Sequence, residues 1–299
     1  MNKYVDKIII VILVIALSFV NKYYGLLFFI FVIVYRELIK RMNGRYYNDE
    51  VDDDDDDQQS TDHVIPLHIY QTYWTESLPP NMNNCVETLK KQNPEFVHHL
   101  YDDNDCRQFI KNNYNDVILN AYNALVPGAY KADLWRYCVL YKKGGVYIDI
   151  KFKCADGVKL INMVDKEYFV EDLISEGEMI GVYNGCMICK KGNKNLLQAI
   201  NQIVENIENN YYGENALAPT GPVLLGKIVT YDEFKNIQLR FVSDLVNYGK
   251  LNESHYIINK TTNQKLFVMY PEYRKDQNDY KESHPHYGKL WYSKQIYKK

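Results

Sequence analysis

Four charged residues, Asp133, Arg136, Asp149 and Lys151, have types and spacing that suit chemistry on a polar ligand. Asp133 and Arg136 stand at positions i and i+3, so on a helix they share one face. There the carboxylate accepts hydrogen bonds from hydroxyl groups, and the guanidinium donates them. The alternative for this pair is a surface salt bridge, which contributes under roughly 1 kcal/mol to stability.

These residues are positioned by a predicted helix and the buried strand that follows it. The segment 128–143 is predicted to be a helix that a Gly-Gly pair ends, and the apolar residues 146–150 are predicted to form a strand. Asp149 lies at the carboxyl end of that strand, where ligands gather in open α/β sheets. The alternative for Asp149 is a cap on the following turn. Residues i and i+2 of a strand share a face, so we expect Lys151 on the side that Asp149 reaches.

Strand-like and helix-like stretches alternate along the rest of the chain. The predicted strands are 64–71, 95–102 and 146–150, with a strand pair over 178–190. The predicted helices are 79–92, 102–113, 128–143 and 193–210, with a further helix that begins near residue 222. This alternation predicts an α/β layered fold with a mostly parallel central sheet.

Two later segments have features that suit a ligand. Thr220 and Gly221 precede a predicted helix, and a helix N-terminus presents free N–H groups that suit an anion. The segment 284–297 contains His286 and Trp291 among other donors and aromatic rings. It closes over a ligand or packs on the domain as a terminal strand, and the pattern leaves both alternatives open.

The N-terminal part of the chain is predicted to be a membrane anchor, residues 1–45, followed by a linker. Residues 8–35 are strongly apolar and lack the cleavage site of a signal peptide, so we expect one long helix or two short ones. Basic residues flank the apolar stretch on both sides, which favours a hairpin with the domain in the cytosol; the Golgi or ER lumen is the alternative. The acidic run within 46–63 predicts a disordered linker, and 64–299 form the main domain.

Composition excludes some classes of partner. The formal net charge is -3, so nothing favours nucleic acid as a partner. The six cysteines are scattered through a large domain, which predicts buried free thiols and not a disulfide framework. Cys186 and Cys189 have CxxC spacing, but a zinc site needs a second ligand pair that the sequence lacks.

The segment GAYKADLWRYCVLYKKGGVYIDI, residues 128–150, resembles the sugar-binding region of glycosyltransferase family 32. The shared pattern is A-x-x-A/S-D-x-x-R-Y-x-x-L-x-x-x-G-G-x-Y-x-D. The family includes yeast mannosyltransferases, and this chain also resembles its uncharacterised members from large DNA viruses. The stretch IPLHIYQTYW, residues 65–74, is similar to the family's first strand. Gln71 matches there, whereas Tyr70 replaces a histidine and the tryptophan is displaced to Trp74.

The resemblance implies a GT-A-like fold, a nucleotide-sugar donor and retention of the anomeric configuration. It implies that Asp149 faces the donor ribose and diphosphate. Asp149 and Lys151 are the residues predicted to act in catalysis, although Lys151 departs from the family's pattern. The residues expected to contact the donor sugar are Asp133, Arg136, Tyr147 and Asn184. The residues expected to contact the nucleotide or diphosphate are Gln71, Gly145, Thr220, Gly221, His286 and Trp291.

The resemblance also implies a divalent metal, Mn²⁺ or Mg²⁺, with Asp149 as a ligand. The family's motif is D-x-D, and Lys151 stands where its second acid, the direct metal ligand, is expected. Three alternatives remain open. Asp149 holds a metal together with a group elsewhere, the Lys151 ammonium itself supplies positive charge to the diphosphate, or the chain is catalytically inactive.

The predicted function is a membrane-anchored hexosyltransferase. Members of the family indicate mannose as the sugar, and the acceptor is a glycan, a lipid or a protein. One alternative is an inactive glycan- or nucleotide-sugar-binding protein of the same fold. The other is a glycoside hydrolase, which needs two carboxylates roughly 5–10 Å apart around one bond.

Overall fold

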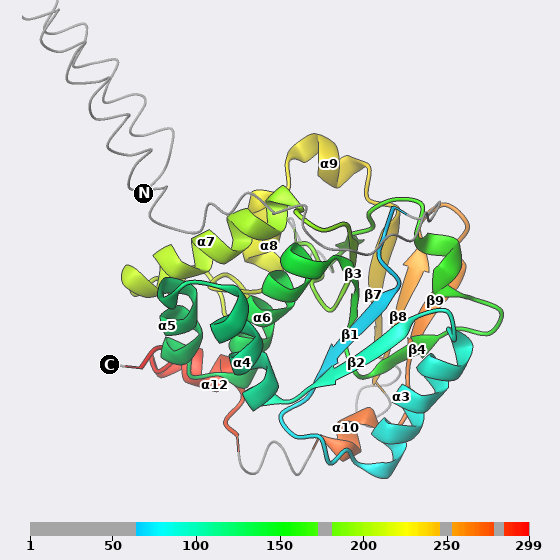
Figure 1. Ribbon diagram of the computed structural model, residues 1–299, viewed down its shortest axis with the longest axis horizontal. Coiled ribbons are helices and arrows are strands. Elements are labelled where there is room, and N and C mark those ends of the chain that lie inside the picture. The colour runs from blue at the N-terminus through cyan, green and yellow to red at the C-terminus, as the bar shows by residue number, and fades with distance from the viewer. Residues whose placement is uncertain (1–63, 173–180, 246–252, 278–283, 299) are drawn as a thin grey trace, which may run out of the picture. The chain divides into compact units, whose positions relative to one another are not determined.

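Figure 1 shows the computed structural model of the chain, which describes residues 64–172, 181–245, 253–277 and 284–298. These residues belong to one compact unit. The predicted anchor, residues 1–45, and the predicted linker, residues 46–63, lie outside the described residues. None of the helices within the described ranges has the length and apolar character needed to cross a membrane.

The first of two sheets has four strands in the order β2-β1-β3-β6. These strands are β1 (His68–Thr72), β2 (Val97–Tyr101), β3 (Gly145–Ile148) and β6 (Cys186–Cys189). The central strand β1 is parallel to β2 and to β3, whereas β6 is antiparallel to β3. The predicted α/β class and the mostly parallel central sheet are confirmed for this sheet.

The second sheet has five strands in the order β4-β9-β8-β7-β5. Its strands are β4 (Phe152–Cys154), β5 (Val170–Glu171), β7 (Leu239–Leu245), β8 (Glu253–Asn259) and β9 (Lys265–Met269). Its neighbours pair in antiparallel fashion except β5 with β7. The sequence did not predict this sheet, and the fold is therefore a mixed α/β arrangement of two sheets.

The helices are α3 (Pro80–Gln92), α4 (Asp103–Asn113), α5 (Asp116–Ala124), α6 (Gly128–Lys143), α7 (Lys194–Glu208), α8 (Pro222–Ile228), α9 (Tyr231–Lys235), α10 (Tyr273–Asp276) and α12 (Tyr287–Tyr292). The predicted helices are confirmed to within two residues at their ends. Figure 1 shows α4, α5, α6 and α7 grouped on one side of the first sheet. Of the predicted strand pair over 178–190, the described part forms one strand, β6.

Helix α6 is buried over most of its surface. It packs on β3 and against α4, α5 and α7, which explains why apolar residues occur almost all round it. Gly144 ends the helix with a φ of 66°. Gly145 follows with a φ of 106°, and a Cβ atom there would lie 2.7 Å from the carbonyl oxygen of His68. Only glycine allows β3 to leave α6 in this conformation so close to β1.

A single buried cluster joins the two sheets. It contains Ile69 and Ile148 from the first sheet and Phe241 and Phe267 from the second. The chain passes from one sheet to the other directly after β3, through the short link Asp149–Lys151 that leads into β4. The predicted strand 146–150 therefore ends earlier than expected, and Asp149 and Lys151 belong to the link between sheets and not to one strand. All six cysteines are buried free thiols, as predicted.

Candidate active site

A cavity of about 580 Å³ lies beyond the carboxyl ends of β1 and β3. Its walls come from α6, the link between β3 and β4, the start of α8, α10 and the segment before α12. The cavity brings together these residues predicted from the sequence: Asp133, Arg136, Tyr147, Asp149, Lys151, Asn184, Gly221 and His286. Open α/β sheets bind ligands at this edge, so we take the cavity as the candidate active site.

The carboxylate of Asp133 is held mainly by neutral donors. Its Oδ2 accepts a hydrogen bond of 2.7 Å from the Thr220 hydroxyl, and its Oδ1 accepts one of 2.9 Å from the Asn184 amide. Arg136 lies farther away, with Nη2 3.6 Å from Oδ1. Burial raises the pKa of Asp133 above its ordinary value, and the charge of Arg136 and these hydrogen bonds offset only part of that rise.

Arg136 connects the two acidic positions. Its Nη1 lies 3.5 Å from Oδ1 of Asp149 and donates to the carbonyl oxygen of Asn184 at 3.0 Å. The guanidinium also lies over the Tyr147 ring, 4.4 Å from the ring centroid. Asp133 and Arg136 are only 8% and 7% exposed, which excludes the alternative of a surface salt bridge.

The carboxylate of Asp149 has four close neighbours that donate to it or carry positive charge. Its Oδ1 accepts from the Tyr147 hydroxyl at 3.0 Å and faces Arg136. Its Oδ2 accepts from the Tyr183 hydroxyl at 3.0 Å and lies 3.2 Å from Nζ of Lys151. Burial raises the pKa of Asp149, but the two cations and the two hydroxyls outweigh burial, so this pKa lies below its ordinary value.

The ammonium of Lys151 lies among aromatic rings. The centroids closest to Nζ are those of Phe152 at 5.2 Å, Tyr183 at 5.5 Å, Tyr273 at 5.8 Å and Phe241 at 5.9 Å. The negative faces of such rings attract a cation. Burial lowers the pKa of Lys151, and its ion pair with Asp149 offsets only part of this effect. The side chain is 12% exposed and lines the cavity.

Four of the predicted residues lie behind the cavity or away from it. Gln71 is buried, donates to the carbonyl oxygen of Asp149 at 3.5 Å and contacts His98. Thr220 supports Asp133 from behind. Gly145 begins β3 at the end opposite Asp149, and the indole of Trp291 donates to the carbonyl oxygen of Tyr212. None of the four lines the cavity that the described residues form, and their contact with a nucleotide stays a prediction.

The C-terminal segment reaches the cavity ahead of α12. His284, Pro285, His286 and Tyr287 all line it. Nδ1 of His286 accepts a hydrogen bond from the backbone N–H of Gly288 at 3.1 Å and so caps α12. The segment is therefore not the terminal strand that one sequence alternative predicted, because residues 287–292 form a helix. Its first residues form part of the cavity wall.

Sequence reasoning missed several residues of the site. Tyr183 donates to Asp149, and Phe241, Tyr273 and Arg274 form the wall around Lys151. Tyr183 directly precedes Asn184, a predicted site residue, so its position in the sequence could have indicated that it belongs to the site. The other three come from β7 and α10, and only the tertiary fold brings them to the cavity.

The residues at the motif do not fit a divalent metal held by Asp149. Both oxygens of that carboxylate already face a hydroxyl donor and a cation, and the residue two positions on is a lysine. Within the described ranges, the one group of three possible ligands is Glu76, Asp102 and Asp105. Asp102 and Asp105 form the capping box of α4, which accounts for their proximity without a metal.

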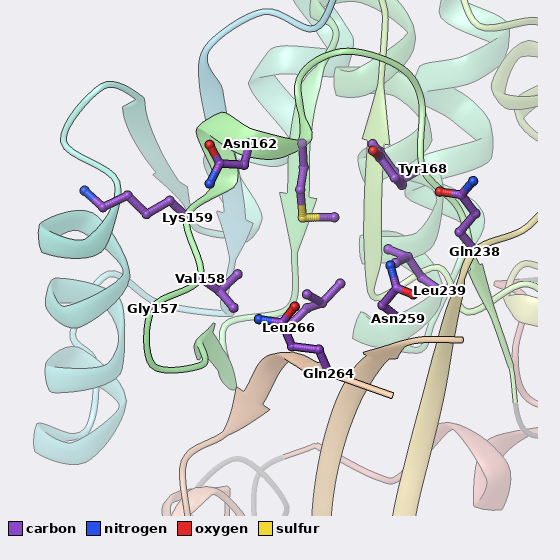
Figure 2. Close-up of a pocket in the computed structure, with 11 residues that line it drawn as sticks. Gly157, Val158, Lys159, Asn162, Tyr168, Gln238, Leu239, Asn259, Gln264 and Leu266 are labelled. Carbon is purple, nitrogen blue, oxygen red and sulfur yellow. The ribbon is translucent and has the colours of Figure 1, made fainter. Parts of the chain in front are cut away.

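A second cavity, of about 240 Å³, lies where β7 and β9 begin and β8 ends (Figure 2). Figure 2 shows the amide side chains of Asn162, Gln238 and Gln264 among the residues that line it, together with Leu239 and Leu266. None of the residues predicted from the sequence lines this cavity in the described part of the chain. The larger cavity is therefore the candidate active site.

A family model described as the glycosyltransferase sugar-binding region containing a DXD motif matches residues 79–170. The match includes the helix and the link that carry Asp133, Arg136, Asp149 and Lys151. This segment is similar to a glycosyltransferase sugar-binding region. The predicted resemblance is confirmed, and the matched segment has Asp149-Ile150-Lys151 at the position that the sequence pattern predicted for the DXD motif.

Three curated relatives agree with this assignment. Inositol phosphoceramide mannosyltransferase 3 of Schizosaccharomyces pombe is 26% identical over 165 residues, which are 55% of this chain and 44% of the relative. The initiation-specific alpha-1,6-mannosyltransferase of Candida albicans is 28% identical over 125 residues, 39% of this chain and 32% of the relative. An uncharacterised glycosyltransferase of Acanthamoeba polyphaga mimivirus is 33% identical over 93 residues, 30% of this chain and 37% of the relative. The chain spans less than half of each relative.

Proposed function

We propose that the chain is a membrane-anchored, retaining glycosyltransferase of GT-A-like fold that moves a hexose from a nucleotide-sugar to an acceptor. The observation that carries the proposal is the largely buried network of Asp133, Arg136, Asp149 and Lys151 in one cavity within a segment that matches a glycosyltransferase sugar-binding region. Mannose is the proposed sugar, since two of the relatives described above are mannosyltransferases by name.

The network supplies the two kinds of contact that such a donor needs. Sugar hydroxyls both donate and accept, and Asp133 with Arg136 offers a carboxylate beside a guanidinium. As the bond from the anomeric carbon to the diphosphate breaks, the departing oxygen takes the electron pair. A fixed positive charge near that oxygen stabilises it most in the transition state. Arg136 and Lys151 are cations buried at the wall of the cavity.

The acceptor and the cellular setting are part of the same proposal. The relative named for inositol phosphoceramide supports a lipid-linked or glycan acceptor. An anchor over residues 1–45 would hold the cavity near a membrane surface, and the flanking basic residues favour the cytosolic side. Digestion of sealed vesicles tests the orientation, because a cytosolic domain is degraded from outside and a lumenal domain in the Golgi or ER is protected.

The deciding experiment is turnover of a panel of UDP- and GDP-sugars by the purified full-length chain, with and without mannosylated glycans and inositol-containing lipids as acceptors. We expect GDP-mannose to be consumed and GDP released, with faster release when the right acceptor is present. Turnover of a UDP-hexose instead would show that mannose is the wrong sugar, and the proposed transferase activity would stand. Binding of donors without any turnover would favour the inactive sugar-binding alternative.

The hydrolase alternative has less support. A glycoside hydrolase needs one carboxylic acid and one carboxylate placed on either side of the scissile bond. Here Arg136 lies between Asp133 and Asp149 and contacts both, and Lys151 covers the other oxygen of Asp149. Hydrolysis of simple glycosides that carry no nucleotide would revive this alternative.

A further inference from the structure

We propose that Lys151 takes the place of the divalent cation at the donor diphosphate, so that this site binds a nucleoside diphosphate without metal. The inference rests on the proposed function and deepens it, since it assigns the charge that holds the leaving group. It follows from four features of the described residues: the charge at position 151, the position of the ammonium, the state of Asp149 and a second cation on the same wall.

The first feature is the charge that position 151 contributes. In a D-x-D motif with its metal, the second acid contributes one negative charge and the divalent cation contributes two positive charges. Their sum is one positive charge, which is also the charge of a single lysine ammonium. Asp149 and Lys151 are in contact at 3.2 Å, and Arg136 balances Asp133 in the same network. The network is therefore electrically complete without an added cation.

The second feature is how firmly the ammonium is positioned. A free lysine loses much side-chain entropy when an anion binds to it, which weakens the contact. Lys151 is already held by Asp149 and by four aromatic rings with centroids within 6 Å of Nζ. Its side chain is 12% exposed, yet it lines the cavity. A cation placed in this way resembles a bound metal in being fixed before the ligand arrives.

The third feature is the state of the Asp149 carboxylate. A metal ligand must offer a lone pair, and each oxygen of Asp149 already faces one tyrosine hydroxyl and one cation. A divalent ion at Asp149 would have to displace Lys151, which is enclosed by rings, or Arg136, which is buried. The structure therefore favours Asp149 as the partner that orients Lys151 and not as a metal ligand.

The fourth feature is Arg274, on the same wall as Lys151. Arg274 belongs to α10 and lines the cavity. The positive charge of Arg274 contributes to lowering the pKa of Lys151, as expected for two cations that lie near each other. Two like charges on one wall repel each other, and an anion between them turns this repulsion into attraction. A diphosphate, which has negative charge on both phosphates, matches such a pair of cations.

The test is calorimetric titration of GDP and UDP into the purified full-length chain, once in excess EDTA and once in Mn²⁺. We expect the preferred nucleotide to bind equally well in both. We expect Lys151→Met, which keeps the length of the stem, to weaken its binding by about tenfold or more, since contacts to a charged group are of that size. Binding of the parent nucleoside, which has no phosphate, should be unchanged.

Two further variants serve as controls. Lys153→Met removes a lysine charge from β4, on a residue that does not line the cavity, and should leave nucleotide binding as it is. Lys151→Arg keeps the charge and should retain most of the binding, which separates loss of charge from loss of folding. Thermal unfolding of each variant reports whether the fold is intact.

Other outcomes would overturn the inference in distinguishable ways. Binding that disappears in EDTA and returns with Mn²⁺ refutes it and leaves the proposed transferase intact. Equal binding by wild type and a folded Lys151→Met also refutes it. If neither nucleotide binds in either condition, the proposed nucleotide-sugar donor is wrong, and the inference fails with it.

Discussion

Two carboxylates line the same cavity, and their neighbours differ in charge. On the α6 wall, Asp133 accepts from the neutral groups of Thr220 and Asn184 and has one cation near it, Arg136, at 3.6 Å. On the wall at the link between the sheets, Asp149 accepts from tyrosines and contacts both Arg136 and Lys151. The pKa of Asp133 is raised by burial, and the pKa of Asp149 is lowered because cations and hydroxyls outweigh burial.

The difference indicates that the two walls contact different parts of the donor. Neutral donors around Asp133 leave its charge available to hydroxyl groups, which suits a sugar. Asp149 is paired with Lys151 and shares Arg136 with Asp133, and the Lys151 ammonium is the cation that we expect to face a phosphate. Changes at the α6 wall should therefore affect the transfer of the sugar, and changes at the Asp149 wall should affect the binding of the diphosphate.

The largest expected effect is that of Asp133→Asn on transfer. The amide has almost the shape of the carboxylate, but it turns one acceptor into a donor that faces Thr220 or Asn184. We expect kcat/KM for the nucleotide-sugar to fall by about 100- to 1,000-fold, the usual loss when one preorganised polar contact is removed from an active site. The measurement is initial-rate kinetics on the preferred donor, alongside calorimetric titration of the free nucleoside diphosphate.

The matched control for this change is Asp116→Asn, at an exposed position in the first turn of α5. It should leave both kinetics and nucleotide affinity unchanged. If Asp133→Asn instead weakened the free nucleoside diphosphate as much as it slowed transfer, the proposed division between the walls would be wrong.

A smaller effect is expected from Thr220→Val. Valine has nearly the same shape, but it leaves Oδ2 of the buried Asp133 without its 2.7 Å hydrogen bond. We expect the free energy of unfolding to fall by about 1.5–3 kcal/mol, which is the range for hydrogen bonds to charged groups. Urea unfolding of the full-length chain measures this loss, and nucleotide affinity should stay as it was.

Thr88 provides the control for Thr220. It is partly exposed on α3, where its hydroxyl donates to a backbone carbonyl in a solvent-exposed hydrogen bond, and Thr88→Val should change stability by no more than about 0.5 kcal/mol. A marked loss of nucleotide affinity in Thr220→Val, with stability unchanged, would restore the role in diphosphate binding that the sequence predicted for this residue.

How well the sequence predicted each part depended on how local the determining contacts are. Asp133 and Arg136 share a helix face, and a Gly-Gly pair ends that helix one short strand before Asp149, so this part of the site follows from spacing. Gly145 and Trp291 illustrate the limit. Gly145 serves the close approach to β1, and the indole of Trp291 donates to the carbonyl oxygen of Tyr212. Neither residue lines the cavity that the described residues form, and their contact with a nucleotide stays a prediction.

The parts that the sequence did not predict depend on contacts between distant segments. The second sheet has five strands, and two of them, β4 and β5, have only three and two residues, which leaves almost no pattern. The rings around Lys151 come from β4, β7, α10 and the residue before Asn184. No local spacing links these positions, so the enclosure of Lys151 appears only in the folded chain.

The smallest expected effect concerns acid stability, where the two carboxylates should act in opposite directions. The pKa of Asp149 in the folded chain lies below its ordinary value of 3.8, so its stabilising contribution is complete above that value and is lost as the pH falls through the folded pKa. The pKa of Asp133 lies above 3.8, so the folded state holds that proton more tightly. Its contribution therefore falls as the pH rises from about 4 through the folded pKa.

Urea unfolding between about pH 3 and pH 6 measures both slopes in the full-length chain. Relative to wild type, Asp149→Asn should lose less stability on acidification, because the group that destabilises the folded state when protonated is gone. Asp133→Asn should lose more, because it removes a group that favours the folded state at low pH. Asp116→Asn, which is exposed, should follow the wild-type curve. If both site variants shifted the slope in the same direction, the two walls would share one electrostatic environment, and their separate roles would have to be abandoned.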